Sequence, residues 1–257
     1  ADVIEEILRI YGYNNIDISE KVNATMAHSD KYADHNIQNV VAEQLVAQGF
    51  LEIMTNSLVS EKEITTYTEN PQQAVKLLNP LSSDLGYMRK NLVFSGLEVI
   101  AYNNNRKRSD LRLFEFGKNY HYINGNYSEN KHLVLYLTGN TQPENWGSPA
   151  QKVSFFQLKG VVESLFERLG LKEIVTLPLE ANEVVYSEGF RWQIGETLLG
   201  TIGVVKTKVL KEFGIKQEVL VADLNWEVIV SQVQGHKVVY KEIPKYPEVR
   251  RDLALLL

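Results

Sequence analysis

The stretch that decides the fold is residues 77–117, LLNPLSSDLGYMRKNLVFSGLEVIAYNNNRKRSDLRLFEFG. An Asn-Pro pair at 79–80 marks a break, and the short polar side chains of 82–84 can bond free backbone amides in a turn or a helix cap. We therefore expect a helix that follows Arg89 and ends at the asparagines of 103–105. Its apolar residues recur at three- and four-residue steps, as one buried helical face requires: Leu92, Val93, Leu97 and Ile100.

A strand should follow the helix, beyond the basic loop of residues 106–108. Large apolar side chains alternate with charged ones across residues 111–117, at the period of two that is typical of strands. We interpret this segment as a half-buried strand.

This order of short motifs resembles the core of the phenylalanyl-tRNA synthetase beta chain, which carries Asn-Pro-Leu-Ser, then Met-Arg, then Leu-Phe-Glu and a glycine. The resemblance implies an α+β fold of the class II aminoacyl-tRNA synthetase type, with a mostly antiparallel sheet flanked by helices. It covers nearly the whole chain and is strongest at residues 2–13, 77–117, 154–160 and 245–253.

Composition sets independent bounds. The 257 residues are 44% hydrophobic, enough to bury one large core, and 27 basic against 32 acidic residues give a net charge of −5. That charge argues against a surface dedicated throughout to nucleic acid. The chain has no cysteine, which excludes disulfides and thiolate chemistry, and no apolar run near the roughly 20 residues that cross a bilayer. We expect a cytoplasmic protein, and a piece of a longer chain.

An acidic helix is predicted at residues 2–13. Helical spacing brings Asp2, Glu5 and Glu6 together on one face, opposite an apolar face. From spacing alone, acids in a first turn most often favour the positive end of the helix dipole, by about 0.3–1 kcal/mol each. The resemblance instead implies that these three carboxylates bind magnesium near the interface with the alpha chain. A further aspartate of that family's site would lie before Ala1, which would leave the site incomplete here.

A second helix is predicted from Asp34, which can cap it, to Gly49, which suits a left-handed C-terminal position. A strand is expected at about 50–58, and a capping box at Ser60 and Glu63 should begin another helix. This order resembles the first motif of class II synthetases, which builds the dimer interface in that superfamily.

Arg89 and the basic loop of residues 106–108 each allow two interpretations. Arg89 can bond turn carbonyls or a carboxylate such as Asp84, and the basic loop can be a solvated surface; alternatively, both can bind phosphates. We assign no ATP site and no catalytic residue. The catalytic class II motifs, Phe-Arg-x-Glu and a later Gly-x-Gly with a following arginine, do not occur in the sequence.

The second half reads mainly as strands, with a turn at Asn124-Gly125 and a helix from about 154 to 169. Residues 154–160 resemble the family's Phe-Phe-Asp-Leu-Lys-Gly, with Gln157 in place of the acid, whereas 186–191 depart from its His-Pro-Gly-Arg. The resemblance implies three regions. They are the end of a small preceding domain with a linker (1–20), a catalytic-like but inactive class II domain (21–240), and a linker with the first strand of a ferredoxin-like anticodon-binding domain (241–257). That strand is expected to begin in the apolar run of residues 253–257.

The resemblance thus implies a non-catalytic beta-chain region that supports a catalytic alpha subunit. That enzyme is an alpha-2-beta-2 heterotetramer that uses ATP and magnesium to attach phenylalanine to tRNA(Phe). Two other classes of function remain open from the residues alone. One is a free-standing metal-dependent hydrolase that uses Asp2, Glu5 and Glu6. The other is a stand-alone RNA-binding module, whose tRNA binding would be sensitive to salt.

Overall fold

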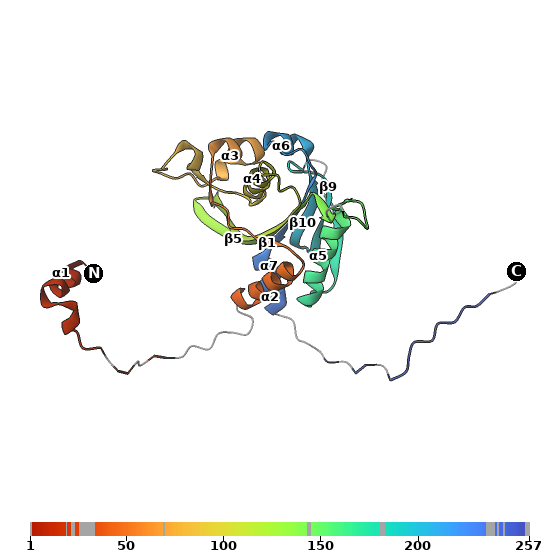
Figure 1. Cartoon of the computed structure of the whole chain (residues 1–257), viewed down its shortest axis with the longest axis horizontal. Helices are drawn as coiled ribbons and strands as arrows, with labels where there is room; N and C mark the ends of the chain where they lie inside the picture. Colours follow the sequence, from red (N-terminus) through yellow and green to blue (C-terminus); the bar gives the residue numbers. More distant parts are fainter. Residues whose placement is uncertain are drawn as a thin grey trace. The chain divides into compact units, whose positions relative to one another are not determined.

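The structure is a computed structural model (Figure 1) that describes residues 2–18, 20–21, 24–25, 34–68, 70–142, 145–179, 183–234, 240, 242–243 and 245–254. The chain divides into two compact units, residues 1–33 and residues 34–257. In the first unit, helix α1 (Asp2–Tyr11) confirms the predicted acidic helix, and a 3-10 helix, η1 (Tyr13–Asn15), follows. No helix in the described ranges has both the length and the apolar character to cross a membrane.

The second unit is built on a seven-stranded sheet, counted over the described residues, in the order β1-β4-β5-β11-β10-β9-β8. Five neighbouring pairs are antiparallel, whereas the edge strand β1 runs parallel to β4. The sheet is therefore mixed, and the expected antiparallel arrangement is confirmed only in part. The strands are β1 (Leu51–Glu52), β4 (Leu111–Ile123), β5 (Asn126–Thr138), β8 (Ile174–Pro178), β9 (Tyr186–Ile194), β10 (Thr197–Val205) and β11 (Val219–Asn225).

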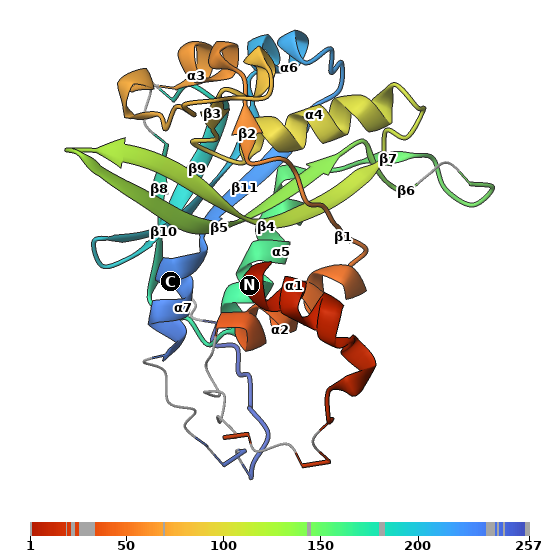
Figure 2. The same ribbon diagram turned by 90° about the vertical axis from the view of Figure 1, so that its left-hand side faces the viewer.

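Helices cover both faces of this sheet (Figure 2). On one face lie α3 (Glu61–Tyr67), α4 (Val93–Asn104) and α6 (Thr207–Glu212); on the other lie α2 (Asp34–Ala47), α5 (Phe155–Arg168) and α7 (Trp226–Gln234). Two pairs of short strands lie outside the main sheet: β2 (Leu58–Val59) with β3 (Tyr87–Met88), and β6 (Asn140–Gln142) with β7 (Gln151–Lys152). Two short 3-10 helices, η2 (Pro71–Gln73) and η3 (Ser83–Leu85), lie between β2 and β3 in the chain.

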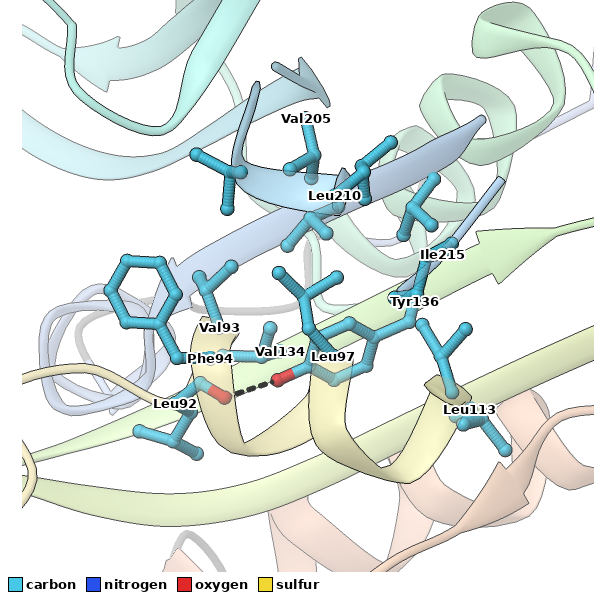
Figure 3. Packing of buried hydrophobic residues seen from close by; sticks show 14 of the residues in the cluster. Leu92, Val93, Phe94, Leu97, Leu113, Val134, Tyr136, Val205, Leu210 and Ile215 are labelled. Carbon is cyan, nitrogen blue, oxygen red and sulfur yellow. Dashed lines mark hydrogen bonds between the residues drawn. The ribbon is translucent and has the colours of Figure 1, made fainter. Parts of the chain in front are cut away.

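A hydrophobic cluster joins α4 to the sheet (Figure 3). Leu97 of α4 and Val134 and Tyr136 of β5 are fully buried in it. The Tyr136 hydroxyl donates a hydrogen bond of 2.7 Å to the Leu92 carbonyl at the start of the helix. A Cβ at Gly96 would lie 2.1 Å from the Tyr136 ring, so the absence of a side chain there lets α4 approach β5 closely.

Helix α4 follows Arg89 and ends at the asparagines, as predicted, but the residues before it are extended. Residues 87–88 form strand β3, and the Arg89 amide donates to the Ser57 carbonyl, which keeps the chain extended up to the first turn of α4. The polar run at 82–84 instead begins the short 3-10 helix η3, where Ser82 makes no side-chain cap hydrogen bond.

Two strand predictions are also corrected. The strand expected at 50–58 consists only of β1 and β2, because the Thr55 amide between them donates to the Glu115 carboxylate and not to a neighbouring strand. The segment 111–117 is not half-buried: Leu113, Phe114 and Glu115 are all buried, since helices cover both faces of β4.

Several local predictions are confirmed. Gly49 ends α2 with a φ of 85°, and Asn124 and Gly125 turn the β4–β5 hairpin with φ values of 52° and 82°. A capping box that was not predicted begins α5, where the Ser154 and Gln157 side chains form both of its hydrogen bonds, so the amide replaces the family's acid without loss of the cap. At Ser60, only the bond from the Glu63 amide to the serine hydroxyl forms.

The predicted domain boundaries fall at sparsely described places. Near residue 21 the chain is described only in part, and residues 235–239 lie outside the described residues. Residues 245–254 contain no strand, so the strand expected in the run 253–257 does not begin at its two described residues, and residues 255–257 lie outside the described part.

Candidate functional site

The main polar centre of the sheet is a buried ion pair between Arg89 and Glu115. Their side chains are 3% and 2% exposed, and the Arg89 Nη1 lies 3.0 Å from a Glu115 carboxylate oxygen. Arg89 follows β3 in the chain, whereas Glu115 stands on β4 on the side facing α4, because it lies opposite Val134 in the hairpin. The strand pairing of β3 and the register of β4 thus bring the two charges together.

Further hydrogen bonds complete this centre. Arg89 Nε donates to the Lys118 carbonyl (2.9 Å), and its Nη1 donates to the Thr55 hydroxyl (2.7 Å). That hydroxyl in turn donates to Glu115 (2.7 Å). A Cβ at Gly117 would lie 2.4 Å from Arg89 Nη2, so this glycine leaves room for the guanidinium. The buried arginine is fixed by protein groups, which supports the structural interpretation of Arg89, with Glu115 and not Asp84 as its partner.

A second polar group crosses the same face of the sheet. His132 Nδ1 on β5 lies 2.6 Å from an Asp223 carboxylate oxygen on β11, and its Nε2 lies 3.1 Å from the Asn119 amide nitrogen. Burial opposes the charged imidazolium, but the Asp223 carboxylate outweighs it and raises the pKa of His132. Sequence reasoning missed this group. The available sign was the placement of polar residues at inward-facing positions of otherwise apolar strands.

The carboxylates predicted to bind magnesium do not form a site on their own. Asp2, Glu5 and Glu6 are all exposed on α1, and Glu6 accepts a hydrogen bond of 3.3 Å from Arg9. Within the described ranges, no three acidic, histidine or cysteine side chains are placed to hold a metal ion. The donor set therefore does not fit magnesium by itself, and the hydrolase interpretation, which needs these acids to converge, gains no support.

The basic loop of residues 106–108 stays exposed at the end of α4. It lies apart from the Arg89 centre in the chain, and the two groups that the sequence suggested as phosphate ligands have different roles: one is buried in an ion pair, the other is open to solvent. The hydrogen bonds of the buried centre hold residues 55–57, the end of β3, and β4 in one arrangement.

The solved structures that resemble this fold identify its class. Two structures of pyrrolysyl-tRNA synthetase from Desulfitobacterium hafniense match with TM-scores of 0.62 and 0.60 at 16% and 15% identity. They cover 79% and 78% of this chain, and the matches span 70% and 69% of those chains. This chain therefore shares the fold of these aminoacyl-tRNA synthetase structures.

Sequence comparisons give the family. The model of the phenylalanyl tRNA synthetase beta chain CLM domain matches residues 18–226, and the chain belongs to this family. The phenylalanine–tRNA ligase beta subunits of Bacteroides fragilis, Porphyromonas gingivalis and Thermotoga maritima are 43%, 37% and 30% identical over the whole chain. The chain spans only 33%, 33% and 32% of the length of these relatives.

Proposed function

We propose that this chain is a non-catalytic core region of a phenylalanine–tRNA ligase beta subunit. In this role it packs against the catalytic alpha subunit in the cytoplasm and positions tRNA-binding modules, while the alpha subunit uses ATP to attach phenylalanine to tRNA(Phe). The observation that carries the proposal is the family membership of residues 18–226, together with the names of the relatives. The expected assembly is an alpha-2-beta-2 heterotetramer.

The packing of the sheet supports a structural role for its α4-facing side. The α4 cluster occupies one part of that side, and Arg89 and Glu115 neutralise each other in another part. An arginine that is buried, with its Nε and Nη1 bonded to protein groups, is a poor ligand for a nucleotide phosphate, because those bonds would first have to break.

The region that we propose for alpha-subunit contact is the edge formed by the end of α2 and the segment from β1 to Met54. Val46, Leu51 and Met54 are 58%, 64% and 95% exposed there, although apolar side chains of this size are usually buried. Clusters of exposed apolar residues mark protein interfaces in soluble proteins.

The remaining regions follow the same proposal. Residues 1–20 end a preceding small domain, residues 21–240 form the inactive class II domain, and residues 241–257 lead into an anticodon-binding domain. Asp2, Glu5 and Glu6 contribute oxygen ligands to a magnesium ion only where other segments complete the shell, since that ion prefers six oxygens. Magnesium titration of the complete beta subunit, with and without Glu5→Gln, tests this contribution.

The test of the main proposal is co-purification with a phenylalanyl-tRNA synthetase alpha chain, followed by light scattering to weigh the complex. We expect stable association, and we expect Met54→Glu to weaken it. Tyr127→Glu serves as the matched control, because Tyr127 is 75% exposed on the distant β4–β5 hairpin. Association that fails with the complete beta subunit as well would refute the proposed role.

A further inference from the structure

A cluster of positive charge stands out on this acidic chain. The loop between α4 and β4 carries Arg106, Lys107 and Arg108 in succession, all of them exposed. Across the described part of the chain, none of the three forms an ion pair. Their charge is therefore available to an anionic partner.

The loop is held in a defined shape. The amides of Arg106, Lys107 and Arg108 donate to carbonyls at the end of α4 over 2.9, 3.0 and 3.1 Å. Lys107 has a φ of 63°, a left-handed conformation that glycine or asparagine adopts with less strain. The Arg106 guanidinium lies over the Tyr102 ring, 3.3 Å from its centroid, and forms a flat exposed platform.

An exposed aromatic side chain lies on the β6–β7 hairpin, at the end of the sheet where the basic loop also lies. Trp146 is 103% exposed, in the turn between β6 and β7. The turn is fixed, because the Asn145 side chain accepts hydrogen bonds from the Gly147 and Ser148 amides over 2.9 and 3.0 Å. A tryptophan held in water by an ordered turn is suited to stack against a flat partner.

The base of the β6–β7 hairpin adjoins the end of the basic loop. The Asn140 amide donates to the Asp110 carboxylate over 2.8 Å, which ties the hairpin of β6 and β7 to the end of the basic loop. A Cβ at Gly139 would lie 2.4 Å from the Ser109 carbonyl oxygen, so the backbones are in close contact there. Figure 2 shows the loop after α4 and the β6–β7 hairpin at the same end of the β4–β5 pair.

We propose that Arg106, Lys107, Arg108 and Trp146 form a contact surface for an unpaired segment of RNA. The three cations bind phosphates, and the indole stacks on a base, which is the combination that single-stranded nucleic acids require. A polypeptide of aspartate and glutamate would use the cations but has no flat group for Trp146, whereas every nucleotide carries a base beside its phosphate. The inference rests on the proposed function, because it names a surface through which the beta-chain region touches RNA.

The experiment measures binding of a short fluorescein-labelled single-stranded RNA to the chain by fluorescence anisotropy over a range of salt concentrations. Replacing all three cations with alanine should make the negative slope of log K against log salt less steep by about 2, since each phosphate contact on a single strand contributes about −0.7. Trp146→Ala should weaken binding about tenfold. Lys107→Gly removes one charge while relieving the backbone, so its loss of binding cannot be ascribed to misfolding.

Matched controls lie elsewhere on the surface. Lys62 and Lys172 are exposed lysines on other elements, and Tyr127 is an exposed tyrosine on the β4–β5 hairpin. Alanine at these positions should leave RNA binding unchanged. The inference is overturned if the loop and Trp146 variants bind RNA like these controls, or if polyglutamate binds as tightly as RNA and without dependence on Trp146. If alpha-chain association persists in that case, only this inference fails and the proposed function stands.

Discussion

Among single residues, Arg89 has the largest expected effect on stability. Its partner Glu115 is almost fully buried, so removal of the guanidinium would leave a carboxylate without compensation inside the protein. Arg89→Met should therefore lower the free energy of unfolding by about 3–5 kcal/mol. Urea denaturation followed by circular dichroism measures this change, and a loss below about 1 kcal/mol would contradict the buried pair.

A double variant separates the charge from the packing. Arg89→Met with Glu115→Gln removes both charges, so it should be more stable than Arg89→Met alone. If the free-energy changes of the two single variants add up to that of the double variant, the two side chains do not interact, which would contradict the structure.

His132 makes stability depend on pH. Its pKa is raised in the folded protein, so its bond to Asp223 contributes fully below the ordinary value of 6.5. This contribution is lost as the pH rises through the higher folded pKa. Asp223→Asn should abolish the loss of stability that the His132–Asp223 pair causes between mildly acidic and alkaline pH. The melting temperature, measured at each pH, tests this. An unchanged pH profile in the variant would show that the pair does not control it.

Two helical glycines provide a matched test at the level of elements. A Cβ at Gly96 of α4 would overlap the Tyr136 ring, whereas a Cβ at Gly160 of α5 would meet nothing within 4 Å. Gly160→Ala should stabilise the protein by about 0.5–1 kcal/mol, because alanine favours the helix. Gly96→Ala should destabilise it by about 1–3 kcal/mol through overpacking. Equal effects, measured by urea denaturation, would be inconsistent with the close approach of α4 to β5.

The junction of α3 and α4 carries an unfavourable charge. Burial, together with the negative charge of Glu98, raises the pKa of Glu63 from 4.5 to about 7. The folded state therefore loses stability as the pH rises from 4.5 through about 7, where this carboxyl ionises. Glu63→Gln should stabilise the protein at pH 8 by on the order of 1–3 kcal/mol and have little effect at pH 4. Stability curves at the two pH values test this, and a destabilised variant at pH 8 would contradict it.

Sequence patterns located the elements better than their ends. Gly49 and the Asn124-Gly125 turn were predictable because each reflects local backbone chemistry. Strand β3 before α4 was not predictable, because the pairing of residues 87–88 with β2 is a contact between distant segments. Likewise the alternation at 111–117 could not reveal that Glu115 is buried, since its partner Arg89 lies 26 residues away in the chain.

At the scale of the whole molecule, family resemblance gave more than periodicity did. The order of motifs indicated the class II core and the beta-chain family, whereas periodicity alone would have left an α+β domain of open function. Candidate sites were harder to predict, because convergence of side chains depends on tertiary structure. The acids of α1 share a helix face and still do not form a metal site in the described residues.

The division of the chain into two units predicts the effect of removing the first one. Residues 34–257 contain the sheet and both helical layers, whereas α1 in residues 1–33 has no buried residue. Deletion of residues 1–33 should therefore leave the cooperative unfolding of the core unchanged to within about 1 kcal/mol, because the sheet and both of its helical layers lie within residues 34–257. Calorimetry of the two chains measures the midpoints. A clearly lower midpoint in the shortened chain would mean that the first unit stabilises the core, and the beta-chain region would then have to be treated as one folding unit.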